Sequence, residues 1–141
     1  MSNLLRQATR DDIEAIWNVR YSVRENRLPH GLVSSEDVRR QIEDTGKGWV
    51  VESDGKIVAF AIGNSTTGNI WGLFVHPSAE GHGHGTRLHD AVTQWLWSQG
   101  HKTLWLTTGA TTRARKFYEL NGWRDVGLTD KGEARYELSR P

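Results

Sequence analysis

Apolar residues recur at the three- or four-residue spacing of a helix in four stretches of the chain. The first stretch opens with Thr9 and Asp12, which have the spacing of a helix-capping pair, and the second opens with the similar pair Ser34 and Asp37. Gly100 follows the third stretch and would close its helix. These features predict helices over residues 9–24, 34–45, 86–99 and 111–121.

Shorter stretches between the helices are rich in Val, Ile, Leu and aromatic residues, which is typical of β-strands. Asp54-Gly55 separates two of them and is a strong signal for a tight hairpin. The third helix lies between two strands with short connections, which favours a right-handed parallel crossover. The pattern therefore predicts an α/β domain with a mixed sheet and strands over residues 3–8, 48–53, 56–63, 70–76, 102–107, 123–126 and 134–138.

The stretch from Leu73 to Leu88, LFVHPSAEGHGHGTRL, joins a buried strand to the third helix through three alternating glycines. The start of a helix leaves backbone N–H groups unpaired and carries about half a positive charge. Glycines before it remove Cβ atoms that would hold a ligand away and permit positive φ angles. The loop is therefore predicted to cradle an anion such as phosphate. It lacks the Lys of a P-loop and the GxGxxG spacing of a dinucleotide fingerprint.

In the form V-x-P-x-x-x-G-x-G-x-G running into a helix, this stretch resembles the signature of the GNAT (Gcn5-related) N-acetyltransferases. The family's core motif is Gln or Arg, two residues, Gly, one residue, then Gly or Ala. Glu80, Gly83 and Gly85 stand at its three defined positions. Glu80 departs from the family because a carboxylate repels a pyrophosphate. Its side chain is expected to point away, which leaves the binding to backbone amides.

A second segment, Thr111 to Gly122 (TTRARKFYELNG), resembles the family's motif Asn-x-x-Ala-x-x-Phe-Tyr-Glu-x-x-Gly, with Thr111 in place of the Asn. The two motifs occur in the family's order, and the resemblance covers almost the whole chain. It implies the GNAT fold, an α/β domain whose mixed central sheet of about six to seven strands is flanked by about four helices. It also implies that strands 4 and 5 splay apart to admit the pantetheine arm of acetyl-CoA.

Composition narrows the class of protein further. One domain is expected over residues 1–141, with 36% hydrophobic residues for its core. The 18 basic and 17 acidic residues are spread along the chain, which argues against a nucleic-acid surface or a membrane-binding patch. The absence of Cys excludes disulfides and thiol nucleophiles. Neither a signal-peptide pattern nor a membrane-spanning apolar run is found, so a cytoplasmic protein is expected.

The activity that the resemblance implies is acetyl transfer from the CoA thioester to a primary amine. An alkylamine has a pKa of about 10, so some group must accept its proton. The family analogy assigns the oxyanion to the backbone N–H of Val75, freed by a strand bulge, and protonation of the leaving thiolate to Tyr118. The residues expected to bind acetyl-CoA are Leu73, Phe74, Val75, Glu80, Gly81, His82, Gly83, His84, Gly85, Thr86, Thr111 and Tyr118.

The general base stays unassigned. Strands 56–63 and 70–76 contain no carboxylate, and strand alternation places His76 on the opposite face from Val75 unless a bulge inverts it. A chain of waters or an acidic residue of the first helices, such as Glu25, would serve equally well.

Several residues have a structural interpretation beside the functional one. Arg20, Arg24 and Arg27 could recognise an acidic acceptor, but spaced Arg residues on a helix usually face solvent. Trp17 or Trp71 could line the acceptor pocket, although most Trp residues are expected in the core.

Residues of the glycine loop and of the segments after it also have both a structural and a functional interpretation. Tyr118 could be a core aromatic, and Thr86 either a phosphate donor or a plain first-turn residue. His82, His84 and His89 lack a carboxylate that would complete a metal site, so no metal is expected. They are expected instead to tolerate a nearby phosphate and to be partly protonated by it.

We therefore expect an acetyl-CoA-dependent N-acetyltransferase that acts directly on the primary amine of a small molecule. A small amine metabolite, an amino compound or a xenobiotic such as an aminoglycoside all fit, and a protein N-terminus fits less well. A non-catalytic module that binds or senses acyl-CoA is the competing interpretation, favoured by Glu80, Thr111 and the missing strand carboxylate. A nucleotide-binding module ranks third. Sheets with open edges also suggest a homodimer.

Overall fold

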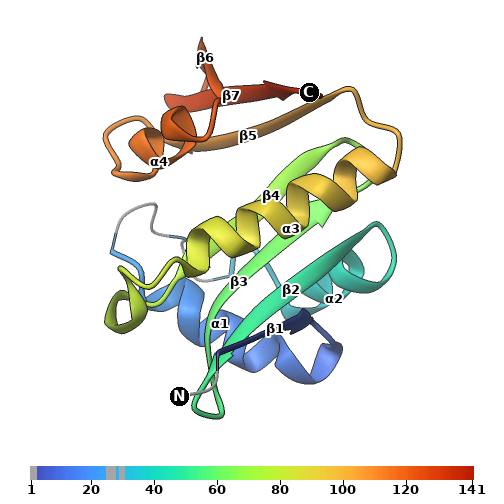
Figure 1. Cartoon of the computed structure of the whole chain (residues 1–141), viewed down its shortest axis with the longest axis vertical. Helices are drawn as coiled ribbons and strands as arrows, with labels where there is room; N and C mark the ends of the chain where they lie inside the picture. The colour runs from blue at the N-terminus through green and yellow to red at the C-terminus, as the bar shows by residue number, and fades with distance from the viewer. Residues whose placement is uncertain (1–2, 25–27, 29–30) are drawn as a thin grey trace.

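The computed structural model describes residues 3–24, 28 and 31–141. The strands are β1 (Asn3–Gln7), β2 (Gly46–Ser53), β3 (Lys56–Asn64), β4 (Asn69–Val75), β5 (Thr103–Gly109), β6 (Arg124–Leu128) and β7 (Glu133–Ser139). The helices are α1 (Ile13–Ser22), α2 (Ser35–Glu43), α3 (His84–Ser98) and α4 (Ala114–Leu120), with 3-10 turns η1 (Arg10–Asp12) and η2 (Pro77–Ala79). The strands form one mixed sheet in the order β1-β2-β3-β4-β5-β7-β6, in which β4 and β5 are parallel (Figure 1).

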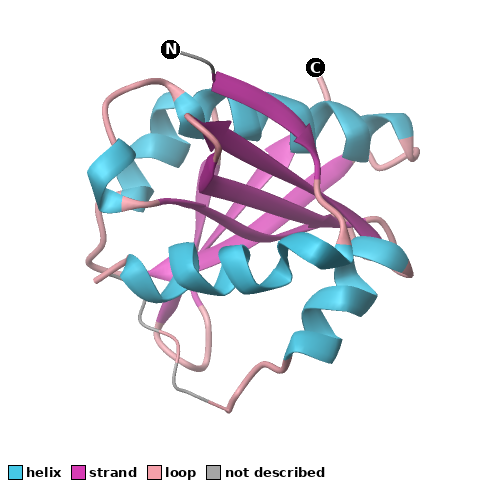
Figure 2. Cartoon of the chain, turned by 90° about the horizontal axis from the view of Figure 1, so that it is seen from below, coloured by secondary structure: helices cyan, strands magenta, loops and turns pink. Residues whose placement is uncertain are grey.

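Helices cover both faces of the sheet and enclose two apolar layers (Figure 2). On one face, α1 and α2 bury Ile16 and Val38 against Val50 of β2. On the other face, Val92 of α3 and Leu104 of β5 belong to a second, larger cluster, to which α4 also contributes. The predicted α/β architecture, a mixed sheet with helices on both sides, is confirmed.

The caps predicted for the first two helices are present. The Ser34 N–H donates to the Asp37 carboxylate at 2.8 Å, and the Asp37 N–H donates to Ser34 Oγ at 3.1 Å. The Thr9 N–H likewise donates to the Asp12 carboxylate at 2.8 Å. That pair caps the turn η1, so the α-helical residues begin only at Ile13.

The helix α1 ends slightly before the predicted boundary, at Ser22. The sequence Leu28-Pro29-His30-Gly31 is expected to close this helix, and its Pro29 and His30 lie outside the described residues. So do two of the candidate functional side chains, Glu25 and Arg27.

The hairpin between β2 and β3 forms where Asp54-Gly55 predicts it. Asp54 has a φ of 52° and Gly55 a φ of 81°, the positive values that a tight two-residue turn requires. The strands that it joins are central, so Val50 and Val51 are both fully buried although they face opposite sides of the sheet.

The strands β4 and β5 pair only near the end at which both begin. Asn69 and Trp105 are the one registered pair, and the Asn69 side chain adds a 3.2 Å hydrogen bond to the Trp105 carbonyl. Beyond this pair the strands diverge, with β5, β7 and α4 standing apart from β4 in Figure 1. The predicted splay of strands 4 and 5 is therefore confirmed.

A β-bulge lies in β4 at Trp71. Ile62 of β3 pairs with Gly72 and the next residue of β3 pairs with Ile70, so Trp71 is the extra residue. Trp71 packs with the α1–α2 cluster, and a Cβ at Gly72 would lie 3.2 Å from the Phe60 ring of the same cluster. Two successive residues thus face α1 and α2, as a bulge permits. The bulge that the family analogy placed at Val75 lies nearer the start of the strand.

The last helix is shorter than the predicted 111–121. Residues 109–112 form a turn instead. The Gly109 carbonyl accepts hydrogen bonds from the Thr112 N–H at 3.3 Å and from the Thr112 hydroxyl at 3.0 Å. This turn replaces the expected first helical turn. The buried Tyr136 of β7 then anchors α4, because its hydroxyl accepts from Arg115 Nε at 3.0 Å and donates to Glu119 at 2.6 Å.

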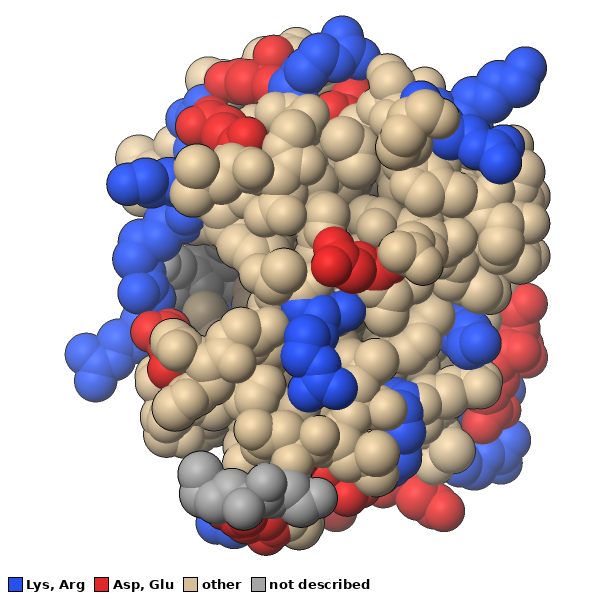
Figure 3. Space-filling view, in the orientation of Figure 1, with Lys and Arg blue, Asp and Glu red and all other residues tan. Residues whose placement is uncertain are grey.

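Charges of both signs are interspersed on the molecular surface. The face seen in Figure 3 shows blue Lys and Arg side chains and red Asp and Glu side chains scattered among uncharged residues, with one group of each sign near its centre. No helix within the described ranges is both long and apolar enough to cross a membrane.

Candidate active site

Two cavities lie beside the gap between β4 and β5. The larger, of about 530 Å³, is lined by α1 and β4 on one wall and by β5, α4 and the start of β7 on the other. The smaller, of about 220 Å³, is lined by the glycine loop, the first turn of α3, Val75 and Phe117.

Backbone conformation explains two of the three glycines in the smaller cavity. Gly81 and Gly83 have φ values of 82° and 81°, and a Cβ on either would meet no atom within 4 Å. These positions thus need glycine for their φ angle and leave open space in front of the backbone. Gly85 is helical, and a Cβ there would lie 3.6 Å from the Phe117 ring. The 15-residue helix α3 starts here, so its unpaired N–H groups open toward the cavity.

The side chain of Glu80, which departs from the family motif, pairs with Arg113. Its carboxylate accepts hydrogen bonds from Arg113 at 3.1 and 3.4 Å, which links the glycine loop to the start of α4. Both side chains are exposed, with 43% of the Glu80 side chain and 75% of the Arg113 side chain accessible. Arg113 therefore offsets the negative charge that Glu80 brings to the rim of the cavity.

His84 and His89 occupy different environments. His84 is buried at the first turn of α3, and its Nδ1 has no hydrogen-bond partner. Burial, with the nearby charges of His82 and Arg87, lowers its pKa, so the free protein holds it neutral at pH 7. His89 belongs to the core, where its Nε2 accepts from Trp123 Nε1 at 2.9 Å. The described residues contain no group of three or more side chains that could hold a metal ion.

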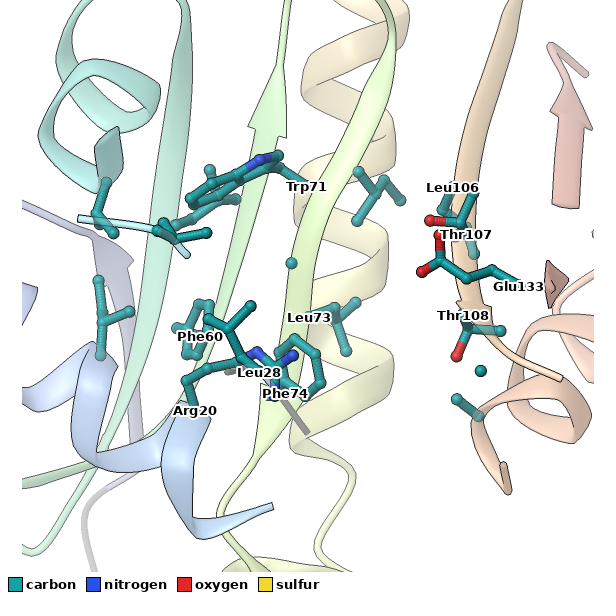
Figure 4. A pocket seen from close by; sticks show the side chains of 18 of the residues that line it. Arg20, Leu28, Phe60, Trp71, Leu73, Phe74, Leu106, Thr107, Thr108 and Glu133 are labelled. Carbon is teal, nitrogen blue, oxygen red and sulfur yellow. The ribbon is translucent and has the colours of Figure 1, made fainter. Parts of the chain in front are cut away.

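One wall of the larger cavity is aromatic (Figure 4). Trp17 of α1 and Trp71 of β4 both line it, together with Phe60 and Phe74. The Arg20 guanidinium lies 4.2 Å from the centre of the Phe74 ring. Desolvation at this position lowers the pKa of Arg20 from its usual value.

Tyr118 reaches the opposite wall from α4. The residue is only 6% exposed, and its hydroxyl hydrogen-bonds to none of the described residues. Burial raises the pKa of the phenol, so the group stays protonated at neutral pH.

Glu133 also lines this wall, and the sequence reasoning missed it. It pairs with Gly109 across the antiparallel β5–β7 ladder, and its side chain points past Thr107 into the cavity (Figure 4). A carboxylate is expected on strand 56–63 or strand 70–76, and neither contains one. The usable signal was strand alternation: the buried Ala134 and Tyr136 place Glu133 on the other face of the sheet.

Strand geometry also sets the direction in which the Val75 N–H points. The His76 N–H donates to the Val58 carbonyl at 2.8 Å and so points toward β3. Because successive N–H groups of a strand point to opposite sides, the Val75 N–H points toward the gap. His76 itself caps η2, with Nδ1 accepting from the Ser78 N–H at 3.0 Å, and lines neither cavity.

Most of the residues predicted to bind acetyl-CoA converge on the two cavities. Leu73, Phe74 and Tyr118 line the larger one. His82 and Thr111 line neither. The smaller one is lined by Val75, Glu80, Gly81, Gly83, His84, Gly85 and Thr86.

Comparisons with known proteins agree with this geometry. The model of the acetyltransferase (GNAT) family matches residues 7–123. No curated protein is similar enough in sequence to match the chain. Among solved structures, an N-acetyltransferase from Staphylococcus aureus Mu50 has a TM-score of 0.81 at 20% identity, with 99% of both chains covered.

Two further structures extend this likeness. The ribosomal-protein-S18-alanine N-acetyltransferase of Escherichia coli has a TM-score of 0.79 at 21% identity, covering 98% of this chain and 94% of that one. The PaiA N-acetyltransferase of Thermoplasma acidophilum, in complex with coenzyme A, has a TM-score of 0.78 at 17% identity, covering 99% and 100%. At these identities the likeness establishes a shared fold.

Proposed function

Because the chain belongs to the acetyltransferase (GNAT) family, whose members use acetyl-CoA, we propose that it acetylates the primary amine of a small molecule by direct transfer. The observation that carries this proposal is the pair of cavities beside the splayed strands. One has the features of a phosphate cradle, and the other is large enough for an acceptor.

The donor would occupy the smaller cavity and the gap. The backbone amides from Gly81 to Thr86 would hold the pyrophosphate, because the helix start supplies unpaired N–H groups and a positive partial charge. The pantetheine arm would then pass between β4 and β5, whose facing backbone groups have no ladder partner beyond Asn69 and Trp105.

The reacting carbonyl would lie in that gap. There the Val75 N–H would stabilise the oxyanion, as its direction away from β3 permits. Tyr118 would protonate the leaving thiolate. Burial raises the pKa of this phenol, so it carries a proton at neutral pH, as a donor must.

The size and lining of the larger cavity favour a small acceptor. Its volume of about 530 Å³ falls within the range of about 300–1,000 Å³ that small-molecule sites occupy. Aromatic side chains would pack against an apolar body, and the positive charge of Arg20 disfavours polycations such as aminoglycosides. A peptide amine is the second acceptor class, because the E. coli structure is that of a ribosomal-protein-S18-alanine N-acetyltransferase.

A homodimer remains part of this proposal. The strands β1 and β6 are the two edges of the sheet, and β6 exposes Val126 and Leu128. Sedimentation at several protein concentrations would detect such a dimer.

The test is a calorimetric titration with acetyl-CoA, followed in the same buffer by a thiol-release screen. The panel should hold small apolar amines, amino acids, an aminoglycoside and a peptide with a free N-terminus. We expect binding, with turnover on one or more of the small amines. Turnover on the peptide alone would refute the small-molecule acceptor, and absence of binding would refute the cradle.

A further inference from the structure

Among the residues that the structure describes, one carboxylate lines the larger cavity, and it belongs to Glu133. Its residue is half-buried, and the carboxylate makes no hydrogen bond or ion pair to any described residue. A carboxylate that lines a cavity without a protein partner is available to a ligand bound there, so Glu133 is a candidate for function.

Glu133 and Tyr118 approach the gap from opposite faces of the sheet. Tyr118 belongs to the α3–α4 side, where its ring packs in the larger apolar cluster. Glu133 lies on the α1–α2 side, facing the aromatic wall that carries Trp71 and Arg20 (Figure 4). A thioester held between β4 and β5 would thus have a proton donor on one side and a proton acceptor on the other.

We propose that Glu133 is the general base that deprotonates the acceptor amine. This assignment rests on the proposed function. It fills the role that the sequence left open among His76, Glu25 and water. His76 caps η2 and lines neither cavity.

The acceptor enters as an ammonium ion, and Glu133 takes one of its protons, which exposes the nitrogen lone pair. The nitrogen attacks the carbonyl carbon, the C–N bond forms, and the C–S bond breaks. Tyr118 protonates the sulfur, and the phenolate recovers the second nitrogen proton. Glu133 then releases its proton to solvent, so each turnover yields an amide, a thiol and one free proton.

Other charged groups face this site. Lys131 lies on the same wall near the β6–β7 turn, and Arg20 faces it from α1. Tyr118 is neutral because burial raises its pKa. The neighbouring Arg135 is engaged with Glu137 at 3.3 Å. Among the described residues that line the cavity, only Glu133 carries a carboxylate.

The test compares Glu133→Gln with Glu137→Gln. Glu137 lies on the same strand and face, outside both cavities, so it controls for loss of a β7 carboxylate. For Glu133→Gln we expect kcat to fall about 10²- to 10⁴-fold with unchanged acetyl-CoA affinity. Its residual rate should rise steadily with pH, because only the neutral amine then reacts. Glu133→Asp should restore part of the rate, and Glu137→Gln should match the wild type.

The outcomes separate the two proposals. An unchanged kcat and pH profile in Glu133→Gln would overturn the base assignment and leave the acetyltransferase standing. A raised KM with unchanged kcat would also overturn it, because that pattern marks uniform binding. Failure of the wild type to acetylate any amine would overturn the proposed function and this assignment together. Retained acetyl-CoA binding in the variant verifies that it is folded.

Discussion

Tyr118 is both a core residue and part of a cavity wall. Its ring packs against those of Phe117, Trp123 and Tyr136 at centroid distances of 5.2, 5.7 and 6.3 Å. These contacts hold the phenol in one orientation, which a positioned proton donor needs. The structural and the catalytic interpretation of this residue are therefore compatible.

Replacing Tyr118 with Phe should lower kcat by about 10²- to 10⁴-fold and leave acetyl-CoA affinity unchanged, because only the proton donor is lost. Tyr136→Phe is the matched control. It removes a buried phenol that bonds Arg115 and Glu119 outside the cavities, so it should lower the thermal midpoint but keep kcat. Thiol release and thermal melts measure both. Equal kcat values for Tyr118→Phe and the wild type would remove Tyr118 from the mechanism.

Glu80 is the residue at which the loop departs from its family. Glu80→Gln should leave acetyl-CoA affinity equal or improved, because it removes a negative charge near the expected pyrophosphate. The exposed pair with Arg113 contributes at most about 1 kcal/mol, so the fold should tolerate its loss. Calorimetry on the variant measures the affinity. A marked loss would mean that the Glu80–Arg113 pair shapes the cradle.

At the scale of elements, the loop between β4 and α3 depends on the backbone of Gly83. Gly83→Ala should cost about 1–2 kcal/mol of stability and also abolish acetyl-CoA binding, because its Cβ enters the open space that a phosphate would fill. Gly55→Ala is a close control, since its φ is also 81° and its Cβ also meets no atom within 4 Å.

Both glycine variants should therefore lose similar stability in chemical denaturation. Only Gly83→Ala should lose binding in calorimetry. Loss of binding in both variants would trace the effect to general destabilisation.

The sequence predicted the elements better than their junctions. Periodicity and turn residues such as Asp54-Gly55 located every helix and strand, because these signals are local. The turn at Thr112 and the bulge at Trp71 were not predicted, since they depend on the Gly109 carbonyl and on pairing with β3.

The same distinction applies to the candidate site. The glycine loop is contiguous in sequence, and its cavity could be predicted from one segment. Glu133 could not be found in this way, because it reaches the cavity through its pairing with Gly109, far away along the chain. Its role depends on a β5–β7 register that no local pattern encodes.

At the scale of the whole molecule, His84 should make stability depend on pH. Its folded pKa lies below the unfolded value of about 6.5, so below that pH the unfolded chain binds more protons. The free energy of unfolding should therefore fall as the pH drops from about 7 to 5.5. Denaturant melts should show a smaller fall for His84→Gln than for the wild type. Equal falls would mean that other groups govern this range.

The single registered pair between β4 and β5 divides the hydrogen-bond ladder into two plates, β1–β4 and β5–β7. The Asn69–Trp105 pair, the Glu80–Arg113 ion pair and the packing of α3 and α4 in the larger apolar cluster join them. A donor whose amide-bearing arm lies between the plates would bind only the folded chain, and it would raise the free energy of unfolding by an amount that grows with donor concentration. The folded enzyme would then be most stable when acetyl-CoA is abundant, so the protein's lifetime would depend on the acetyl-CoA concentration in the cell.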